Sequence, residues 1–162
     1  MNIKWEGQVY IRENMDKSLF KLMKESGCYN MFIGLESGSD LILKKMKKNF
    51  NTASASEFFV KCRENGLHFE ISLILGYPGE TLNTIDETMN FLKINSALIP
   101  KIAQINQYIY YKFSEVTENE YLIQKEVNKN IGITEHINRI LEFAKSCNIK
   151  YTKAFINNLA VL

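Results

Sequence analysis

The sequence predicts an α/β fold in which about four parallel strands alternate with helices. Apolar runs rich in β-forming residues occur at 31–35, 69–75 and 102–109, and a shorter alternating run occurs at 8–12. Segments with helical periodicity separate these runs. Each is long enough for a crossover connection, so neighbouring strands should be parallel. The nearly continuous apolar runs are typical of strands that are covered on both faces.

The first half of the chain carries signals for where its helices begin and end. Asp16 has the character of an N-cap, and Gly27 falls where a C-cap glycine belongs. A short helix should span 40–47. Ser54 and Glu57 have the spacing of a capping box at the start of the next helix.

The second half continues the alternation and then loosens. A helix should end before Pro100, and an amphipathic helix should span 134–147. Residues 1–113 therefore form the strand–helix part of one domain, and residues 114–162 form a mostly helical C-terminal extension of it. The final segment, 149–162, fits a last strand or a helical turn equally well.

Composition places the chain among ordinary globular proteins. Its 162 residues are 46% apolar and 23% charged, with a formal net charge of +2. We therefore expect one domain with a real core, no nucleic-acid partner and no membrane partner. No stretch approaches the ~20 apolar residues of a membrane span, and the first residues lack a signal-peptide core, so we expect a soluble cytoplasmic protein. The lysine cluster at 44–48 is typical of a solvated helix face.

The cysteines and histidines give no sign of a metal site. Cys28, Cys62 and Cys147 are too widely spaced for a disulfide framework or a zinc site. Their apolar neighbours favour buried, inert thiols. His68 and His136 each stand alone in the sequence, which favours structural roles.

Two segments that follow predicted strands carry the most specific signal. The first runs from Phe32 to Asp40 and continues through Leu43–Met46 to Lys48, and the second runs from Ile74 to Thr81. In order and position, both resemble segments of radical S-adenosylmethionine (SAM) enzymes, particularly the branch of cobalamin-binding enzymes and methylthiotransferases. The resemblance covers roughly residues 5–110. It implies a (β/α) TIM-like barrel, of which this chain would hold the C-terminal half.

The resemblance also implies a cradle for SAM at the carboxyl ends of the strands. Glu36 and Ser37 would face the ribose or the amino group of SAM, because a carboxylate accepts hydrogen bonds from hydroxyl and ammonium donors. The side chain of Ile74 and the backbone at Gly76 would line the adenine, since glycine lets a ligand approach the backbone closely.

Two basic residues would complete this cradle. Arg12 ends the first predicted strand and would point into the barrel mouth, and Lys48 matches a position that meets the SAM carboxylate in relatives. Plainer interpretations stay open: an exposed lysine at 48, an ion pair of Arg12 with Glu36 or Glu13, and a carboxylate that only braces a loop at Glu36.

The resemblance stops at the iron–sulfur cluster. Radical SAM chemistry needs a CxxxCxxC motif whose three thiolates hold a four-iron–four-sulfur cluster, and this sequence has no such motif. The first strand here resembles the third strand of the family, so two strand–helix units are missing. Residues 110–114 also depart from the family pattern, which leaves the substrate open. We therefore expect the cluster in full-length relatives but not in this chain, which would bind SAM weakly and would not catalyse alone.

Missing strands would leave an open barrel edge, with unpaired backbone groups and an inward apolar face. We expect a homodimer or a partner chain to cover that edge. Two functions follow: a fragment of a radical SAM (Fe–S oxidoreductase-like) protein that retains part of the SAM cradle, or a cluster-less binding or assembly module that self-associates or completes a barrel with a partner chain. An unrelated α/β enzyme is disfavoured because two motifs match in order.

Overall fold

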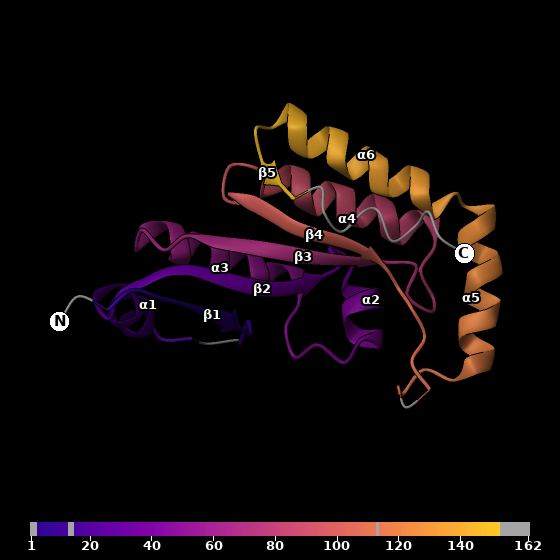
Figure 1. The fold of residues 1–162 in the computed structure, drawn as a ribbon, viewed down its shortest axis with the longest axis horizontal. Coiled ribbons are helices and arrows are strands. Elements are labelled where there is room, and N and C mark those ends of the chain that lie inside the picture. The colour runs from indigo at the N-terminus through magenta and orange to yellow at the C-terminus, as the bar shows by residue number, and fades with distance from the viewer. Residues whose placement is uncertain (1–2, 13–14, 113, 153–162) are drawn as a thin grey trace.

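The computed structural model of the chain describes residues 3–12, 15–112 and 114–152. Five strands form one parallel sheet in sequence order (Figure 1). The α/β class and the parallel arrangement are confirmed, with one short strand more than the four expected. The strands are β1 (Trp5–Val9), β2 (Cys28–Glu36), β3 (Phe69–Leu75), β4 (Lys101–Gln107) and β5 (Lys150–Tyr151).

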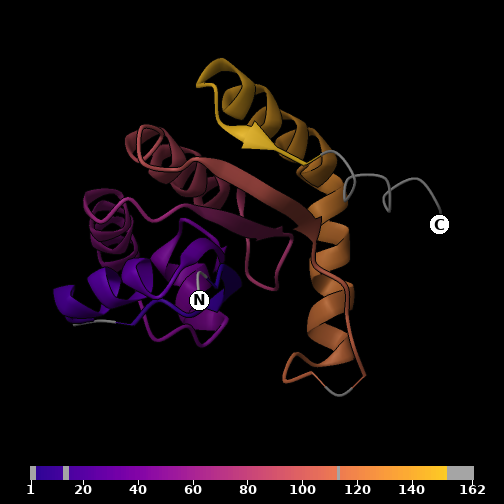
Figure 2. The same cartoon turned by 60° about the vertical axis from the view of Figure 1, so that its left-hand side comes forward.

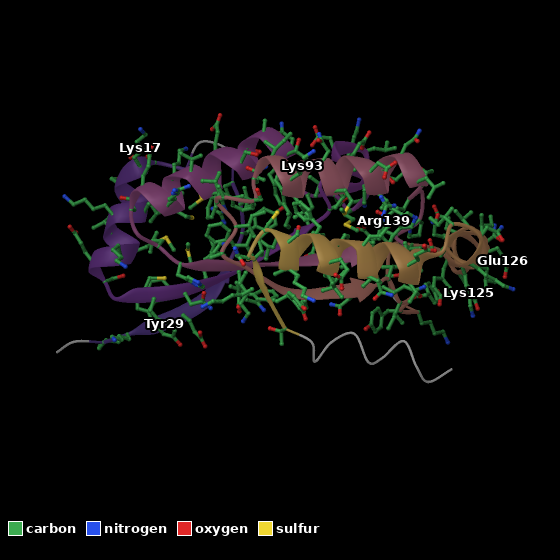
Figure 3. The ribbon with its side chains drawn as sticks, turned by 90° about the horizontal axis from the view of Figure 1, so that it is seen from above. Lys17, Tyr29, Lys93, Lys125, Glu126 and Arg139 are labelled. Atoms are coloured by element: carbon green, nitrogen blue, oxygen red, sulfur yellow. The ribbon has the colours of Figure 1, made fainter. Side chains whose placement is uncertain are left out.

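Helices fill the connections and cover one side of the sheet. Figure 3 shows Lys17 and Lys93, from the first and fourth helices, on one side of the sheet and Tyr29 of β2 on the other. No helix in the described part of the chain is long and apolar enough to cross a membrane. The helices are α1 (Lys17–Glu25), α2 (Asp40–Lys45), α3 (Thr52–Glu64), α4 (Leu82–Ile94), α5 (Glu118–Asn130) and α6 (Ile133–Ser146).

The structure confirms the signals predicted for the two ends of α1 and corrects the capping box predicted for α3. The Asp16 side chain accepts a hydrogen bond from the Ser18 N–H at 3.0 Å, and Gly27 follows α1 with a φ of +94°. The capping box predicted for Ser54 and Glu57 was wrong. Asn51 is the N-cap of α3, because its side chain accepts from the Ser54 N–H at 2.9 Å and its own N–H donates to the Ser54 hydroxyl at 3.0 Å.

The first edge strand differs from the expectation, and the last one resolves an alternative that the sequence left open. β1 spans Trp5–Val9 and not 8–12, so Arg12 lies three residues beyond the strand end. At the other edge Lys150 and Tyr151 pair with β4, which makes the start of the final segment a strand (Figure 2). Residues 153–162 lie outside the described part of the chain.

The core lies between the sheet and its helices. Alternate residues of β2 and β3 point into it and are buried, and Phe59 of α3 stacks on Phe69 with ring centroids 4.8 Å apart. α6 adds Ile137 and Ile140 to the same cluster. Burial of a side chain of this size stabilises the fold by ~1.5–3 kcal/mol. The alternating buried residues of β2 and β3 include Met31, Ile33, Leu35, Phe69, Ile71, Leu73 and Leu75.

The opposite face of the sheet differs from the inward apolar face predicted for a partial barrel. The residues that alternate with the core positions are mostly polar, with Phe32 and Ile74 as apolar exceptions. A face of this kind suits a polar ligand better than a second hydrophobic layer. The other members of this open face are Asn30, Gly34, Glu36, Glu70, Ser72, Gln104 and Asn106.

Candidate functional site

Glu36 occupies the carboxyl end of β2 in an unusual backbone conformation. Its φ angle is +67°, in the left-handed region that side-chain-bearing residues rarely adopt. The register of β2 against β3 shifts between Gly34 and Glu36, which is a bulge. Bulges re-aim a side chain, and backbone strain of this kind concentrates at ligand sites. The bulge therefore sets the direction of the Glu36 carboxylate.

Two neighbours hold that carboxylate on the open face. Lys48 Nζ lies 3.3 Å from Glu36 Oε1, and the Ser72 hydroxyl donates to Glu36 Oε2 at 3.3 Å. The Glu36 side chain is 16% exposed and that of Lys48 is 18% exposed. The carboxylate is thus oriented by two strands and a loop, and its side chain stays partly exposed.

Tyr10 fixes the loop that carries Lys48. The Asn49 N–H donates to the Tyr10 hydroxyl at 3.0 Å, and the Tyr10 ring meets Phe50 edge to face at 5.9 Å. Lys48 Nζ lies 5.9 Å from the centroid of the Tyr10 ring, within reach of a cation–π interaction. The end of β1 therefore helps to place the ammonium group beside Glu36.

Gly34 leaves the space in which this ion pair lies. Lys48 Nζ donates to the Gly34 carbonyl oxygen at 3.3 Å. A Cβ atom on Gly34 would collide with Glu36 Oε1 and would come within 3.5 Å of Lys48 Nζ. The absence of a side chain at this position is what lets the carboxylate and the ammonium lie over the strand.

The second predicted segment lies on the adjacent strand, β3. Ile74 is half-buried on the open face, and Gly76 follows with a φ of +82°. The Glu80 carboxylate turns inward and accepts a hydrogen bond from the Gly76 N–H. Burial raises the pKa of the Glu80 carboxyl to about 7, although the N–H groups of Gly76 and Tyr77 act in the opposite direction. Glu80 thus supports the Gly76 turn from beneath and offers no exposed charge.

Two predicted site residues lie elsewhere. Ser37 is buried, and its hydroxyl lies 3.2 Å from the Thr88 hydroxyl of α4 and accepts from the Ser39 N–H at 3.1 Å. This geometry gives Ser37 a bracing role, and its contact with SAM stays a prediction. Arg12 is exposed and, within the described residues, forms no ion pair with Glu36, whose carboxylate is paired with Lys48.

The cysteines do not fit an iron–sulfur cluster. Cys28 and Cys62 are buried in β2 and α3, and burial raises the pKa of the Cys62 thiol to about 12. Cys147 is partly exposed at the end of α6, so the expectation of burial was wrong for this residue. No group of three or more His, Cys, Asp and Glu residues in the described ranges could hold a metal ion.

A hollow lies at the opposite end of the strands. It measures about 980 Å³ and is lined by residues that include Asn30, Glu70, Lys101 and Tyr151. Those residues stand at the amino ends of β2, β3 and β4 and in β5. Ligand sites of parallel α/β folds lie at the carboxyl ends of the strands. We therefore assign the candidate site to Glu36, with its neighbours, and not to this hollow.

The fold is that of a parallel α/β protein of the barrel type, with a candidate ligand site at the carboxyl ends of its strands. A family model described as the radical SAM superfamily matches residues 9–92, just over half of the 162 residues. The chain belongs to this superfamily. An uncharacterized methyltransferase from Pyrococcus horikoshii is 29% identical over 57% of this chain, and the ribosomal protein uS12 methylthiotransferase RimO from Phocaeicola vulgatus is 35% identical over 48% of it.

Solved structures agree on the fold. Coproporphyrinogen III oxidase (HemN) from Escherichia coli superposes on 89% of this chain with a TM-score of 0.63 at 14% identity. The cobalamin-dependent SAM radical enzyme OxsB covers 86% of it with a TM-score of 0.54 at 16% identity. The chain spans about a fifth of the two curated relatives named above and 32% of the HemN chain.

Sequence reasoning missed four residues of the site. In the sequence, Ser72 lies within the apolar run at 69–75 and Tyr10 within the alternating run at 8–12, so neither stands out. Gln124 and Asn128 of α5 contact the Gly76 turn, as described below. Their spacing of four residues is compatible with one face of a helix, but no motif in this polar segment links them to the Gly76 turn.

Proposed function

We propose that this chain is the nucleoside-binding half of a SAM-binding barrel. Glu36 would accept hydrogen bonds from the ribose hydroxyls of SAM, with Lys48 and Ser72 fixing its two oxygens. Ile74 and the backbone at Gly76, on the adjacent strand, would form the shelf for the adenine. The orientation of the Glu36 carboxylate supports this proposal most strongly. It combines a bulge, a positive φ angle, an ion pair and a hydroxyl donor in one partly exposed group.

The chemistry of radical SAM enzymes would require a part that this chain does not supply. In that superfamily an iron–sulfur cluster provides the electron that cleaves SAM. The described residues hold no set of thiolates for it. We therefore propose that the chain binds the nucleoside part of SAM and is inactive alone. Anaerobic treatment with iron and sulfide should yield neither a visible cluster absorbance nor 5′-deoxyadenosine from SAM and a reductant.

Calorimetric titration of SAM tests the proposal. Glu36→Gln removes the charge at nearly constant size and should weaken binding at least tenfold, which is about 1.4 kcal/mol. Glu70→Gln is the matched control, because Glu70 is also a carboxylate on the open face, is also 16% exposed and is also paired with a lysine, Lys101. An equal loss of SAM affinity in both variants, or no SAM binding by the wild-type chain, would contradict the proposal.

A cluster-less assembly module is the second candidate, and the edge strand β1, which pairs with β2 alone within the described residues, favours it. β1 is an edge strand, and Trp5–Val9 contains neither proline nor lysine, the residues that commonly protect such edges. A second copy or a chain that carries the missing strands would pair there. Analytical ultracentrifugation at micromolar concentration checks this, because a stable monomer that also fails to bind a cluster-bearing radical SAM fragment would exclude the module.

A further inference from the structure

α5 buries two polar residues and exposes two apolar ones among its charged residues, which departs from the usual pattern of a surface helix. Gln124 and Asn128, one turn apart, are each 4% exposed, whereas Leu122 and Ile123 are 52% and 60% exposed. In Figure 1 the helix crosses the end of the sheet toward which the strands point. The amides of Gln124 and Asn128 must therefore have specific partners at this edge, because a buried amide is costly unless it is hydrogen-bonded.

That partner is the turn at residues 76–80. Asn128 Nδ2 donates to the Gly76 carbonyl oxygen at 3.0 Å. Gln124 Oε1 accepts from the Gly79 N–H at 2.8 Å, and Gln124 Nε2 donates to the Glu80 carbonyl oxygen at 3.0 Å. A fourth bond, from Gln124 Nε2 to Asn128 Oδ1 at 2.9 Å, ties the two amides together. Three backbone groups of the turn thus depend on α5.

The contact fixes Gly76 from two sides. Its N–H donates to the Glu80 carboxylate, and its carbonyl accepts from Asn128. A Cβ atom on Gly76 would collide with the Asn128 amide, so the glycine is also needed for the close approach of the helix. The peptide planes around Gly76 can rotate only if these bonds break. α5 therefore determines the orientation of the backbone that would meet the adenine.

We infer that Gln124 and Asn128 are positioning residues for the nucleoside site, and that docking of α5 and binding of SAM are coupled. The inference rests on the proposed SAM site. It extends the functional unit beyond the matched segment 9–92 to α5, residues 118–130. A turn that is already held in place saves the ligand the cost of ordering it. Coupling of binding equilibria is reciprocal, so SAM must in turn stabilise the docked helix.

Hydrogen exchange of the wild-type chain tests the coupling without any substitution. Saturating SAM should slow amide exchange in the turn at 76–80 and also in α5, while α1, far along the sheet, should be unaffected. Slower exchange in the turn alone would overturn the inference. Absence of SAM binding would overturn the proposed function, and the inference with it.

Asn128→Asp provides the second test. It keeps the shape of Asn128 but replaces the donor to the Gly76 carbonyl with a charged oxygen, and SAM affinity measured by calorimetry should fall at least tenfold. At acid pH the protonated carboxyl group of the variant can again donate to the Gly76 carbonyl oxygen. The loss of SAM affinity relative to wild type should therefore be smaller at acid pH. Lys125→Ala and Glu126→Ala are the controls, because Figure 3 shows both side chains pointing away from the body of the protein. A variant that melts earlier but binds SAM as tightly as wild type, at every pH, would reduce Asn128 to a purely structural role and overturn the inference.

Discussion

Lys48 Nζ lies 3.3 Å from both the Glu36 carboxylate and the Gly34 carbonyl oxygen, so the ammonium group joins the bulge of β2 to the loop after α2. This geometry distinguishes two roles for Lys48. An ammonium that orients Glu36 affects every ligand with a ribose, whereas one that contacts the SAM carboxylate affects SAM alone. Because the ion pair with Glu36 is already formed, we predict that Lys48→Met weakens the binding of SAM and the binding of adenosine by similar factors, at least several-fold. Parallel calorimetric titrations check this.

The matched control is Lys101→Met, which removes the partner of Glu70 at the far end of the open face. It should leave both affinities unchanged. A loss confined to SAM in Lys48→Met would favour direct contact with the SAM carboxylate, as the family resemblance implies, and would contradict the orienting role.

Alanine at two glycines of the same segment should separate binding from stability. In Gly34→Ala the new Cβ would press on Glu36 Oε1 and Lys48 Nζ, the flexible ends of two side chains, which can move. We predict an unfolding free energy within about 0.5 kcal/mol of wild type and a clear loss of SAM affinity. Urea denaturation and calorimetry on the same preparation check both quantities.

Gly38→Ala should behave in the opposite way. Its Cβ would lie 2.7 Å from Phe91 Cβ and 2.8 Å from the Cα atom of Thr88, and α4 cannot withdraw its backbone cheaply. Overpacking of this kind costs about 1–3 kcal/mol, so the urea midpoint should fall well below that of Gly34→Ala. Equal midpoints for the two variants would contradict the packing described around Gly38.

Glu80 should make the stability of the chain depend on pH. Its pKa is raised from 4.5 to about 7 by burial, so between these values the folded chain binds a proton that the unfolded chain has lost. The contribution of Glu80 to stability is therefore fully present below about pH 4.5 and is lost as the pH rises to about 7. A difference of this size corresponds to at most about 3 kcal/mol.

Glu80→Gln should abolish this slope, because a neutral amide oxygen can still accept from the Gly76 N–H. Urea denaturation at about pH 5 and about pH 8 should show a smaller decline for the variant than for wild type. Glu126→Gln, at an exposed position of α5, should decline like wild type. Parallel curves for all three proteins would show that Glu80 is not buried as a proton-binding group.

Local patterns predicted most of the fold. β3 was expected at 69–75 and lies there, because strongly apolar β-formers between Gly66 and Gly76 leave no alternative. The first strand was expected three residues late, since Trp5, Glu6 and Gly7 have a mixed composition and owe their strand form to pairing with β2. Tertiary pairing of this kind is not written in the local sequence.

The site was less predictable than the fold. Glu36 and Gly76 stand in recognisable motifs at strand ends, but the orientation of Glu36 comes from a bulge that only the register with β3 reveals. Ser37 shares the motif and yet faces Thr88 of α4, because the chain reverses direction between the strand and α2. Asn128 contributes from 52 positions downstream of Gly76, a distance at which no sequence pattern links the two.

The three cysteines should differ in reactivity by burial alone. Cys28 and Cys62 are buried, and burial raises the pKa of both thiols, that of Cys62 to about 12, so neither forms the reactive thiolate at neutral pH. Cys147 is partly exposed at the end of α6. Iodoacetamide should therefore modify Cys147 first in the native protein and the other two only in urea, as read by mass spectrometry of peptides. Cys147→Ser should remove the native reaction entirely. Rapid native labelling of Cys62 would mean that α3 opens from the sheet, and the packing of Phe59 on Phe69 would then have to be dynamic.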